Sequence, residues 1–431
     1  MGENVYSRFE RSVASNMNLR LYNISFNKGD KQYLYDTDNK KYLDCFSGAT
    51  TAILGYNNRE IINAYVETCG KLHHTCSVYT PTEEVVDLAE KLITIVPSSN
   101  KKNKVIFGLS GSDAIECAIK AARKFTKRKS VFCFNKAYHG SCGLSISATR
   151  WDSLREGLIL DDNFHSFPYP IEEKDTHTII ESLKKYSNND LPSAVIIESI
   201  QGDGGMYPAD ENFLKDLSQF CNENNIVLIF DEIQSGMGRT GKWWGFEHAE
   251  IIPDIVVVGK AVSGGYGVLS AAIGRAEILD SLGKGQHVFT YSASPHACAV
   301  CSTVINIIER NNHISKNDQL GLSFSRKLKS IKSPIIKDVR GKGLMIGVEI
   351  DPIKNINAGL VGLRCAEKGV YFGYYGQHNE VLRIHPPFII DENDIDFACH
   401  VLDETLKEIY ENRIPSETFD KFSKYCVGLG E

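Results

Sequence analysis

A lysine and an aspartate each follow a short apolar run in this sequence of 431 residues. Lys260 comes two residues after Ile255–Val258, and Asp231 comes directly after Ile226–Phe230. If such a run is a buried strand, burial lowers the pKa of the lysine at its end and leaves a neutral amine, the form that makes a Schiff base. A carboxylate at the end of a neighbouring strand suits the protonated ring nitrogen of a cofactor. Alone, Lys260 could equally be a solvent-exposed lysine, and Asp231 could equally be a helix cap. The prediction of a cofactor site therefore depends on the two residues together.

A turn of small residues follows a third apolar run. Gly108–Asp113 comes after Val105–Phe107 and leads into a helical pattern. Small residues let the backbone approach an anion, and the helix N-terminus offers free N–H groups and the positive end of its dipole. Asp113 and Glu116 have the spacing of a capping box. An ordinary capped turn would contain the same residues, so the anion site depends on the neighbouring motifs.

Apolar runs and helical patterns alternate through the middle of the chain. This alternation predicts an α/β fold with a mostly parallel sheet covered by helices. We expect an N-terminal segment (1–55) that joins a small domain, a large domain (56–300) and a small α+β domain (301–431). The runs that predict buried strands are Val105–Phe107, Val131–Phe134, Ala194–Ile197, Ile226–Phe230 and Ile255–Val258.

The order of these motifs resembles that of the class III aminotransferases of pyridoxal 5′-phosphate (PLP) fold type I. The resemblance runs from about residue 28 to about residue 405. It implies PLP as the cofactor, a fold with a large and a smaller domain, and Lys260 as the Schiff-base lysine. It also implies that Asp231 holds the ring nitrogen and that Gln234 reaches the 3′-oxygen of the cofactor.

The same resemblance assigns the other site residues. Tyr138 would stack on the cofactor ring, and Thr290 would reach the phosphate of a neighbouring subunit, which implies a homodimer. Arg383 would bind the α-carboxylate of the substrate, and Glu198 is also expected to bind the substrate. The full set expected to bind the cofactor is Ser110, Gly111, Ser112, Tyr138, Asp231, Gln234, Lys260 and Thr290.

The family implies chemistry at Cα of an amino acid, with Lys260 as the base. Transamination, which moves an amino group between an amino acid and a 2-oxo acid, is the reaction we expect first. However, Asp203 in Gln201–Gly205 resembles the family's racemase branch, which includes isoleucine 2-epimerase and aminocaprolactam racemase. In that branch the matching aspartate is a second base. A turn aspartate that caps its own backbone is the plainer explanation, so racemisation by Lys260 and Asp203 stays open as the alternative.

Composition limits the other possibilities. A net charge of −6 gives no basis for binding nucleic acid or an anionic membrane. No stretch approaches the roughly 20 apolar residues of a membrane helix, and the first residues do not resemble a signal peptide. The 12 cysteines are scattered and mostly lie in apolar segments, which is typical of a reducing compartment. We therefore expect a cytoplasmic enzyme without a metal ion.

Overall fold

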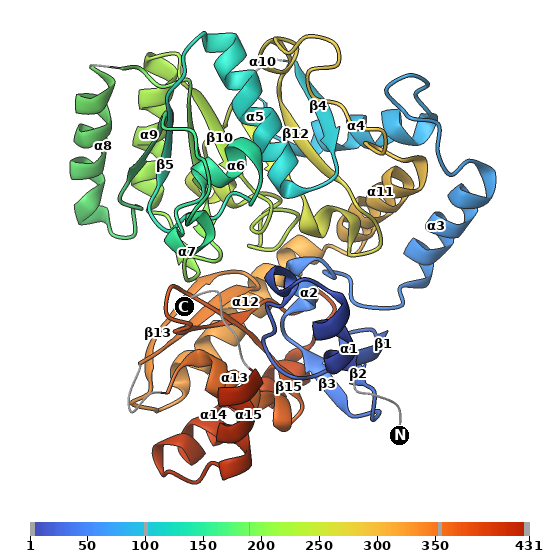
Figure 1. Cartoon of the computed structure of the whole chain (residues 1–431), viewed down its shortest axis with the longest axis vertical. Coiled ribbons are helices and arrows are strands. Elements are labelled where there is room, and N and C mark those ends of the chain that lie inside the picture. Colours follow the sequence, from blue (N-terminus) through green and yellow to red (C-terminus); the bar gives the residue numbers. More distant parts are fainter. Residues whose placement is uncertain (1–4, 99–101, 189, 352–355, 426–431) are drawn as a thin grey trace. The chain divides into compact units, whose positions relative to one another are not determined.

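The computed structural model describes residues 5–98, 102–188, 190–351 and 356–425. Contacts divide the chain into two units, one from Met1–Asn57 and Gln319–Glu431 and one from Asn58–Asp318 (Figure 1). The expected division was at about residues 55 and 300. The second unit continues past residue 300 because helix α11 (Pro295–Arg310) packs against other helices of that unit.

A seven-stranded sheet forms the centre of the second unit, in the order β4-β12-β11-β10-β7-β5-β6. Only β12 runs antiparallel to its neighbours. The prediction of an α/β fold with a mostly parallel sheet is confirmed, and all five expected strands are present. The strands are β4 (Asn103–Gly108), β5 (Val131–Phe134), β6 (Phe164–Phe167), β7 (Ala194–Glu198), β10 (Val227–Asp231), β11 (Ile255–Val258) and β12 (Ser270–Arg275).

Helices cover both faces of this sheet (Figure 1). One face packs under α5 (Gly111–Thr126), whose alanines and isoleucines form a buried cluster with every second residue of the strands. Phe132 and Phe134 point to the other face. Phe132 contacts Tyr186 of α8 (Glu173–Ser187), and Phe134 contacts Phe213 of α9 (Glu211–Glu223), both edge to face. Strands β5, β7, β10 and β11 are buried along their whole length, as their uninterrupted apolar runs predict. The same expectation is wrong for Val105–Phe107, which is only partly buried because β4 lies at the edge of the sheet.

The remaining elements of this unit are short or lie beside the sheet. Helices α3 and α4 pack against α11. The bounds are α3 (Arg59–Lys71), α4 (Glu83–Ile95), α6 (Gly143–Ala148), α7 (Asp152–Arg155), α10 (Ala276–Leu279), the 3₁₀ helices η2 (Gly245–Ala249) and η3 (Lys260–Ser263), and the strand pair β8 (Ile200–Gln201) and β9 (Tyr207–Pro208).

The first unit contains two four-stranded sheets, β1-β2-β3-β15 and β13-β14-β17-β16. The first of them joins N-terminal strands to β15, which pairs parallel with β3. The strands are β1 (Phe26–Asp30), β2 (Tyr33–Asp36), β3 (Lys41–Asp44), β13 (Ile336–Lys342), β14 (Met345–Ile350), β15 (Val370–Tyr371), β16 (Gly373–Tyr375) and β17 (Val381–Ile384). The helices are α1 (Val5–Ser12), η1 (Ser15–Met17), α2 (Ser47–Thr50), α12 (His313–Ser330, in which the boundary falls), α13 (Ala358–Glu367), α14 (Glu392–Tyr410) and α15 (Ser416–Tyr425). None of the described helices is long and apolar enough to cross a membrane.

The sheet register brings the predicted chemistry to one edge of the second unit. Asp231 ends β10 and lies directly opposite Glu198, the last residue of β7. On its other side Asp231 pairs with Val257 of β11, three residues before Lys260. Because parallel strands end at the same edge, these side chains meet where ligands of such sheets bind.

Candidate active site

A cavity of about 160 Å³ lies at this edge of the sheet. Its walls come from the segments that follow β4, β5, β7, β10 and β11. The residues that line it are Gly111, Ser112, Tyr138, His139, Gly140, Glu198, Asp231, Ile233, Gln234 and Lys260. The structure therefore brings together most of the site residues that the sequence predicts.

The turn after β4 is built around a helix cap. The backbone N–H groups of Leu109 and Ser110 both donate to Asp113 Oδ2, at 2.8 Å each, and Asp113 N donates to Ser110 Oγ at 3.2 Å. This reciprocal pair is the capping box of α5. The predicted box between Asp113 and Glu116 is wrong, because the helix already begins at Gly111. Ser110 therefore shapes the turn and is not among the residues that line the cavity.

Two glycines keep the entrance to α5 free of side chains. A Cβ on Gly111 would lie 2.7 Å from Ile233 Cδ1, and one on Gly140 would lie 2.5 Å from Ser112 Oγ. Gly140 also has a φ of +133°. The backbone is thus exposed beside the N-terminus of a 16-residue helix, where an anion is stabilised. These residues fit the phosphate group of PLP.

Asp231 is held by two groups on the protein. Its Oδ2 lies 2.8 Å from His139 Nδ1, and its Oδ1 accepts a hydrogen bond from Ile233 N at 3.1 Å. Asp231 is 5% exposed and His139 is 1% exposed. A carboxylate fixed in this way suits a protonated pyridine nitrogen. His139 was not predicted from the sequence, where the only signal for it was its place between Tyr138 and Gly140.

Glu198 connects two other parts of the wall. Its Oε1 accepts a hydrogen bond from Tyr138 N at 3.2 Å, and its Oε2 accepts one from Gly202 N at 2.9 Å. Burial, and then the nearby charge of Asp231, raises the pKa of Glu198 well above its ordinary value. Glu198 therefore fixes both the aromatic residue of the wall and the turn that carries Asp203.

Asp203 does not line the cavity and is 7% exposed. Gln234 Nε2 donates to Asp203 Oδ1 at 3.0 Å. A Cβ on Gly202 would lie 2.1 Å from Gln234 Oε1, so only glycine lets the amide approach the turn. Burial, and then the charge of Asp203, raises the pKa of the Tyr138 hydroxyl. Asp203 therefore contacts one residue of the cavity wall, Gln234, and its charge acts on the hydroxyl of another, Tyr138.

Lys260 extends from the end of β11 and lines the cavity. It is half-buried and has a φ of +37°, which is uncommon for a residue other than glycine. Gly259 next to it lies against Gly111 and Ile233, since a Cβ there would be 3.6 Å from atoms of both. Lys260 thus starts from the side of the cavity formed by Ile233.

Besides Ser110 and Asp203, two further predicted residues do not line this cavity. Thr290 is exposed on the second unit. Arg383 belongs to the first unit, where it is 1% exposed in β17. Its guanidinium lies over the rings of Tyr375 and Phe46, at 4.8 and 5.6 Å, and its Nε donates to His385 Nδ1 at 3.1 Å.

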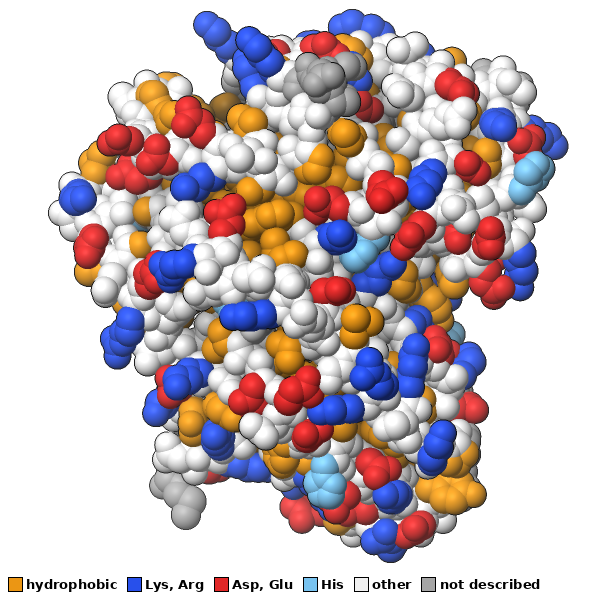
Figure 2. All heavy atoms as spheres, turned by 180° about the vertical axis from the view of Figure 1, so that it is seen from behind, with side chains coloured by type: hydrophobic (Ala, Val, Ile, Leu, Met, Phe, Trp, Pro, Cys, Tyr) orange, Lys and Arg blue, Asp and Glu red, His pale blue; other side chains and the backbone are white. Residues whose placement is uncertain are grey.

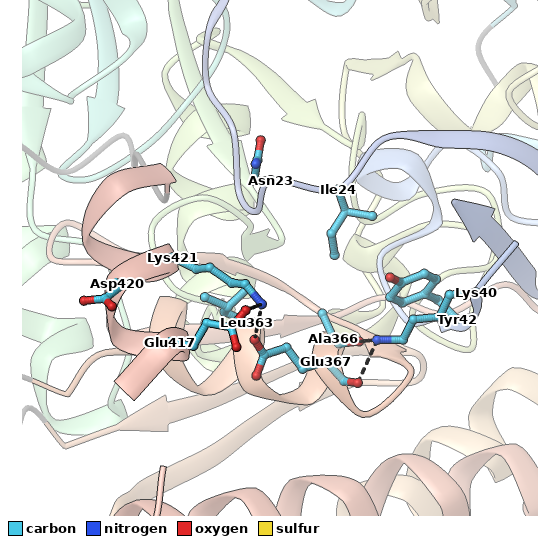
Figure 3. A pocket seen from close by; sticks show the side chains of 10 residues that line it. All are labelled: Asn23, Ile24, Lys40, Tyr42, Leu363, Ala366, Glu367, Glu417, Asp420 and Lys421. Carbon is cyan, nitrogen blue, oxygen red and sulfur yellow. Dashed lines mark hydrogen bonds and ion pairs between the residues drawn. The ribbon is translucent and has the colours of Figure 1, made fainter. Parts of the chain in front are cut away.

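A larger cavity, of about 530 Å³, lies within the first unit (Figure 3). Four of its charged side chains, those of Lys40, Glu367, Glu417 and Lys421, bond to one another or to the backbone. Lys40 Nζ donates to the carbonyl oxygens of Ala366 and Glu367, at the end of α13, and Lys421 Nζ lies 3.4 Å from Glu367 Oε1. None of the predicted site residues lines this cavity, so size alone would select the wrong place for the chemistry.

Two further observations concern surface charge and metal-binding side chains. On the face shown in Figure 2, lysines and arginines are interspersed with acidic side chains. Among the residues that the structure describes, no group of three or more His, Cys, Asp or Glu side chains is placed to hold a metal ion.

Comparisons with known proteins agree with this geometry. Residues 14–406 match the family model described as aminotransferase class-III. The alanine/serine racemase of Pyrococcus horikoshii is 33% identical, over 94% of this chain and 90% of that protein. The leucine/methionine racemase of Thermococcus litoralis is also 33% identical, over 96% of this chain and 98% of that protein.

Transaminases are similar to the same degree. The acetylornithine aminotransferase of Methanocaldococcus jannaschii is 33% identical, over 89% of this chain and 93% of that protein. A solved aminotransferase structure from Bacillus anthracis superimposes with a TM-score of 0.86 at 26% identity, over 93% of this chain and 97% of that one. This chain therefore belongs to the class III aminotransferases and is a PLP-dependent enzyme of that family.

Proposed function

We propose that this enzyme inverts an amino acid at Cα, as a racemase or epimerase, with Lys260 and Asp203 as its two bases. The observation that carries the proposal is the buried carboxylate of Asp203, which is hydrogen-bonded to Gln234 and close to Tyr138. PLP, when bound, withdraws electrons from Cα and makes its proton removable. Inversion then needs one group that removes a proton and another that returns one from the opposite side.

The surroundings of the two groups support this division of roles. Lys260 follows Gly259, which lies against Ile233. Asp203 accepts a hydrogen bond from Gln234, and its charge, after burial, raises the pKa of the Tyr138 hydroxyl. The family resemblance implies that the aromatic ring and the aliphatic side chain cover opposite faces of the cofactor. In the proposed reaction Lys260 acts from the face of the aliphatic side chain and Asp203 from the face of the aromatic ring.

The other site residues would bind the cofactor and the substrate and orient them. The turn Ser110–Ser112 would hold the phosphate, and Asp231, oriented by His139, would hold the ring nitrogen. Arg383 would bind the substrate α-carboxylate through paired hydrogen bonds. The substrate binding predicted for Glu198 stays a prediction, and its contacts with two backbone N–H groups support a further role in holding the wall.

Transfer of an amino group to a 2-oxo acid is the second candidate. It is the reaction in the family's name and in the name of the acetylornithine relative. It needs Lys260 as base but no second base, because Lys260 would pass the proton it takes from Cα to the cofactor on the same side. In that case Asp203 serves only as a hydrogen-bond partner of Gln234.

A homodimer is part of the proposal. Thr290 is exposed in the single chain, and its neighbour Tyr291 is 62% exposed and stacks on His74. We propose that Thr290 reaches the phosphate bound in the partner subunit. Dilution below the dimer dissociation constant should then release PLP, whereas a monomer that retains PLP equally well would contradict this assignment. The described cysteines are all free thiols, which supports a reducing, cytoplasmic location.

The experiment that separates the two reactions omits the amino acceptor. The PLP-loaded enzyme is incubated with single enantiomers of neutral amino acids and no 2-oxo acid, and the products are separated on a chiral column. A racemase brings each enantiomer towards a mixture of both. Turnover that appears only when a 2-oxo acid is added, without inversion, would establish the second candidate instead.

A further inference from the structure

The four residues of α2, in the first unit, have a left-handed backbone and form a turn rather than an ordinary right-handed helix. The φ angles of Ser47, Gly48, Ala49 and Thr50 are 51°, 55°, 57° and 72°. Only one of the four is glycine, and other L-residues adopt this conformation rarely and usually one at a time. A strained run of this kind persists only where its surroundings enforce it, and such runs are concentrated at functional sites.

Asp44, the last residue of β3, holds this turn. Its side chain is fully buried, and its Oδ1 accepts hydrogen bonds from Phe46 N at 2.8 Å and Ser47 N at 2.9 Å. Its Oδ2 accepts a hydrogen bond from Tyr56 Oη at 2.7 Å. Both carboxylate oxygens are therefore engaged, and two of the donors are backbone groups at the start of the turn.

The same turn is fastened to the end of β17. Ser47 Oγ donates to the carbonyl oxygen of His385 at 2.6 Å, and His385 N donates to the carbonyl oxygen of Cys45 at 2.7 Å. His385 also accepts from Arg383 Nε, while Phe46 lies under the Arg383 guanidinium. The orientation of Arg383 thus depends on two residues that the turn keeps in place.

We propose that Asp44 is a positioning residue for recognition of the substrate carboxylate. By holding the left-handed turn it fixes Phe46 and His385, and through them the plane of the Arg383 guanidinium. A guanidinium forms two parallel hydrogen bonds to a carboxylate only when the two planes are aligned. The inference rests on the proposed function, in which Arg383 binds the α-carboxylate.

Three substitutions remove graded parts of this support. Asp44→Ala removes the hydrogen bonds from Phe46 N, Ser47 N and the Tyr56 hydroxyl together. Asp44→Asn keeps the Oδ1 acceptor for the two backbone groups and loses only the acceptor for the Tyr56 hydroxyl. Tyr56→Phe removes that last bond from the other side. We expect the effect of Asp44→Ala to exceed that of the other two, which should resemble each other.

The readout is competitive inhibition of the PLP-loaded enzyme by isovalerate, a carboxylate without an amino group. Asp44→Ala should raise its inhibition constant about tenfold or more, and Asp44→Asn and Tyr56→Phe should each raise it by a measurable factor of about two to three. Bound PLP, measured by its absorbance, should stay constant. A purely structural Asp44 would lower the melting temperature and leave the inhibition constant of the folded enzyme unchanged, which would overturn the inference.

Arg383→Lys separates this inference from the function on which it rests. If Arg383→Lys leaves isovalerate inhibition unchanged, the substrate role of Arg383 fails. If Arg383→Lys weakens inhibition and Asp44→Ala does not, only the positioning role of Asp44 fails. In the double variant, Asp44→Ala should add little to Arg383→Lys, whereas two effects that multiply would overturn the inference. If Asp44→Ala does not fold, unchanged inhibition in Tyr56→Phe would overturn it in the same way.

Discussion

Asp231, at the end of β10, and Asp203, in the turn after β8, are both buried aspartates with different partners. The two Asp231 oxygens contact a histidine ring and a backbone N–H group, both fixed by the sheet. Asp203 accepts from the amide of Gln234 and lies in a turn between glycines. We propose that these different contacts serve different roles: Asp231 holds the cofactor ring from a fixed position, and Asp203 is the second base of the proposed inversion.

Lys260→Ala should have the largest effect, because it removes the group that both aspartates assist. We expect turnover to fall by about 10³-fold or more, together with the absorbance of the bound imine. Steady-state rates and visible spectra measure both effects. Lys215→Ala, at an exposed position of α9, is the matched control and should behave as wild type. A Lys260→Ala variant that retains a tenth of the activity would show that Lys260 is not the base that the two aspartates are proposed to assist.

Asp231→Asn tests the proposed role of the Asp231 carboxylate at the cofactor ring. The variant keeps the size of the side chain and loses its charge, so any reaction at Cα should slow by about 10²-fold. His139→Asn should cost about tenfold, because it removes the orienting group and leaves the carboxylate. Initial rates at saturating PLP check both expectations. Equal effects of the two substitutions would show that His139 does more than orient Asp231.

Arg383→Lys should affect binding more than chemistry. A lysine cannot make the paired, planar contact of a guanidinium, so the KM for an α-amino acid should rise by about 10- to 100-fold. The comparison substrate is the amine that lacks the carboxylate, and its apparent affinity should change little. An equal loss for both compounds would make Arg383 a structural residue.

The smallest expected effect is on stability and involves Glu232, the neighbour of Asp231. Burial raises the pKa of Glu232 to about 7, although Ser199, Ser235 and two backbone N–H groups donate to it. A raised pKa means that the folded protein holds the proton more tightly than the unfolded chain does. The contribution of Glu232 to the free energy of unfolding should therefore be fully present below the ordinary pKa of 4.5 and be lost as pH rises through about 7, by at most about 3 kcal/mol.

Glu232→Gln should flatten this dependence, which urea denaturation at pH 5 and pH 8 can measure. The variant stays neutral at both pH values, so the difference between the two curves isolates Glu232 from the other titrating groups. The same slope in both proteins would show that Glu232 does not hold its proton in the folded state.

Much of the sheet follows from the sequence, and the exceptions have a physical reason. Five strands contain uninterrupted apolar runs and were predicted. Two strands were missed because their sequences do not show this pattern. Strand β12 consists largely of small residues such as Ala271 and Ala272, and β6 contains His165 and Ser166. Small residues are buried in β12 because the neighbouring strands and α5 leave little room, which no local pattern reveals.

The site residues, like the strands, could be predicted only where a local sequence pattern sets their position. Residues at the ends of apolar runs, such as Lys260 and Asp231, could be predicted because the strand itself sets their place. His139 and Asp44 were missed because their roles depend on contacts with residues far away in the sequence or on a backbone conformation. The turn Ser47–Thr50 contains a single glycine, so its left-handed run has no clear signal in the sequence.

The most direct test of the central claim is deuterium exchange in wild type and Asp203→Asn. Each enantiomer is incubated separately in deuterated water without a 2-oxo acid, and chiral separation with mass spectrometry follows inversion and label at Cα. Asp210→Asn, at the N-cap of α9, is the matched control. We predict that wild type and control invert both enantiomers and label Cα. Asp203→Asn should lose inversion by about 10²-fold and still label one enantiomer with retention, through Lys260. Inversion by Asp203→Asn at the wild-type rate, or no inversion by wild type, would contradict the account.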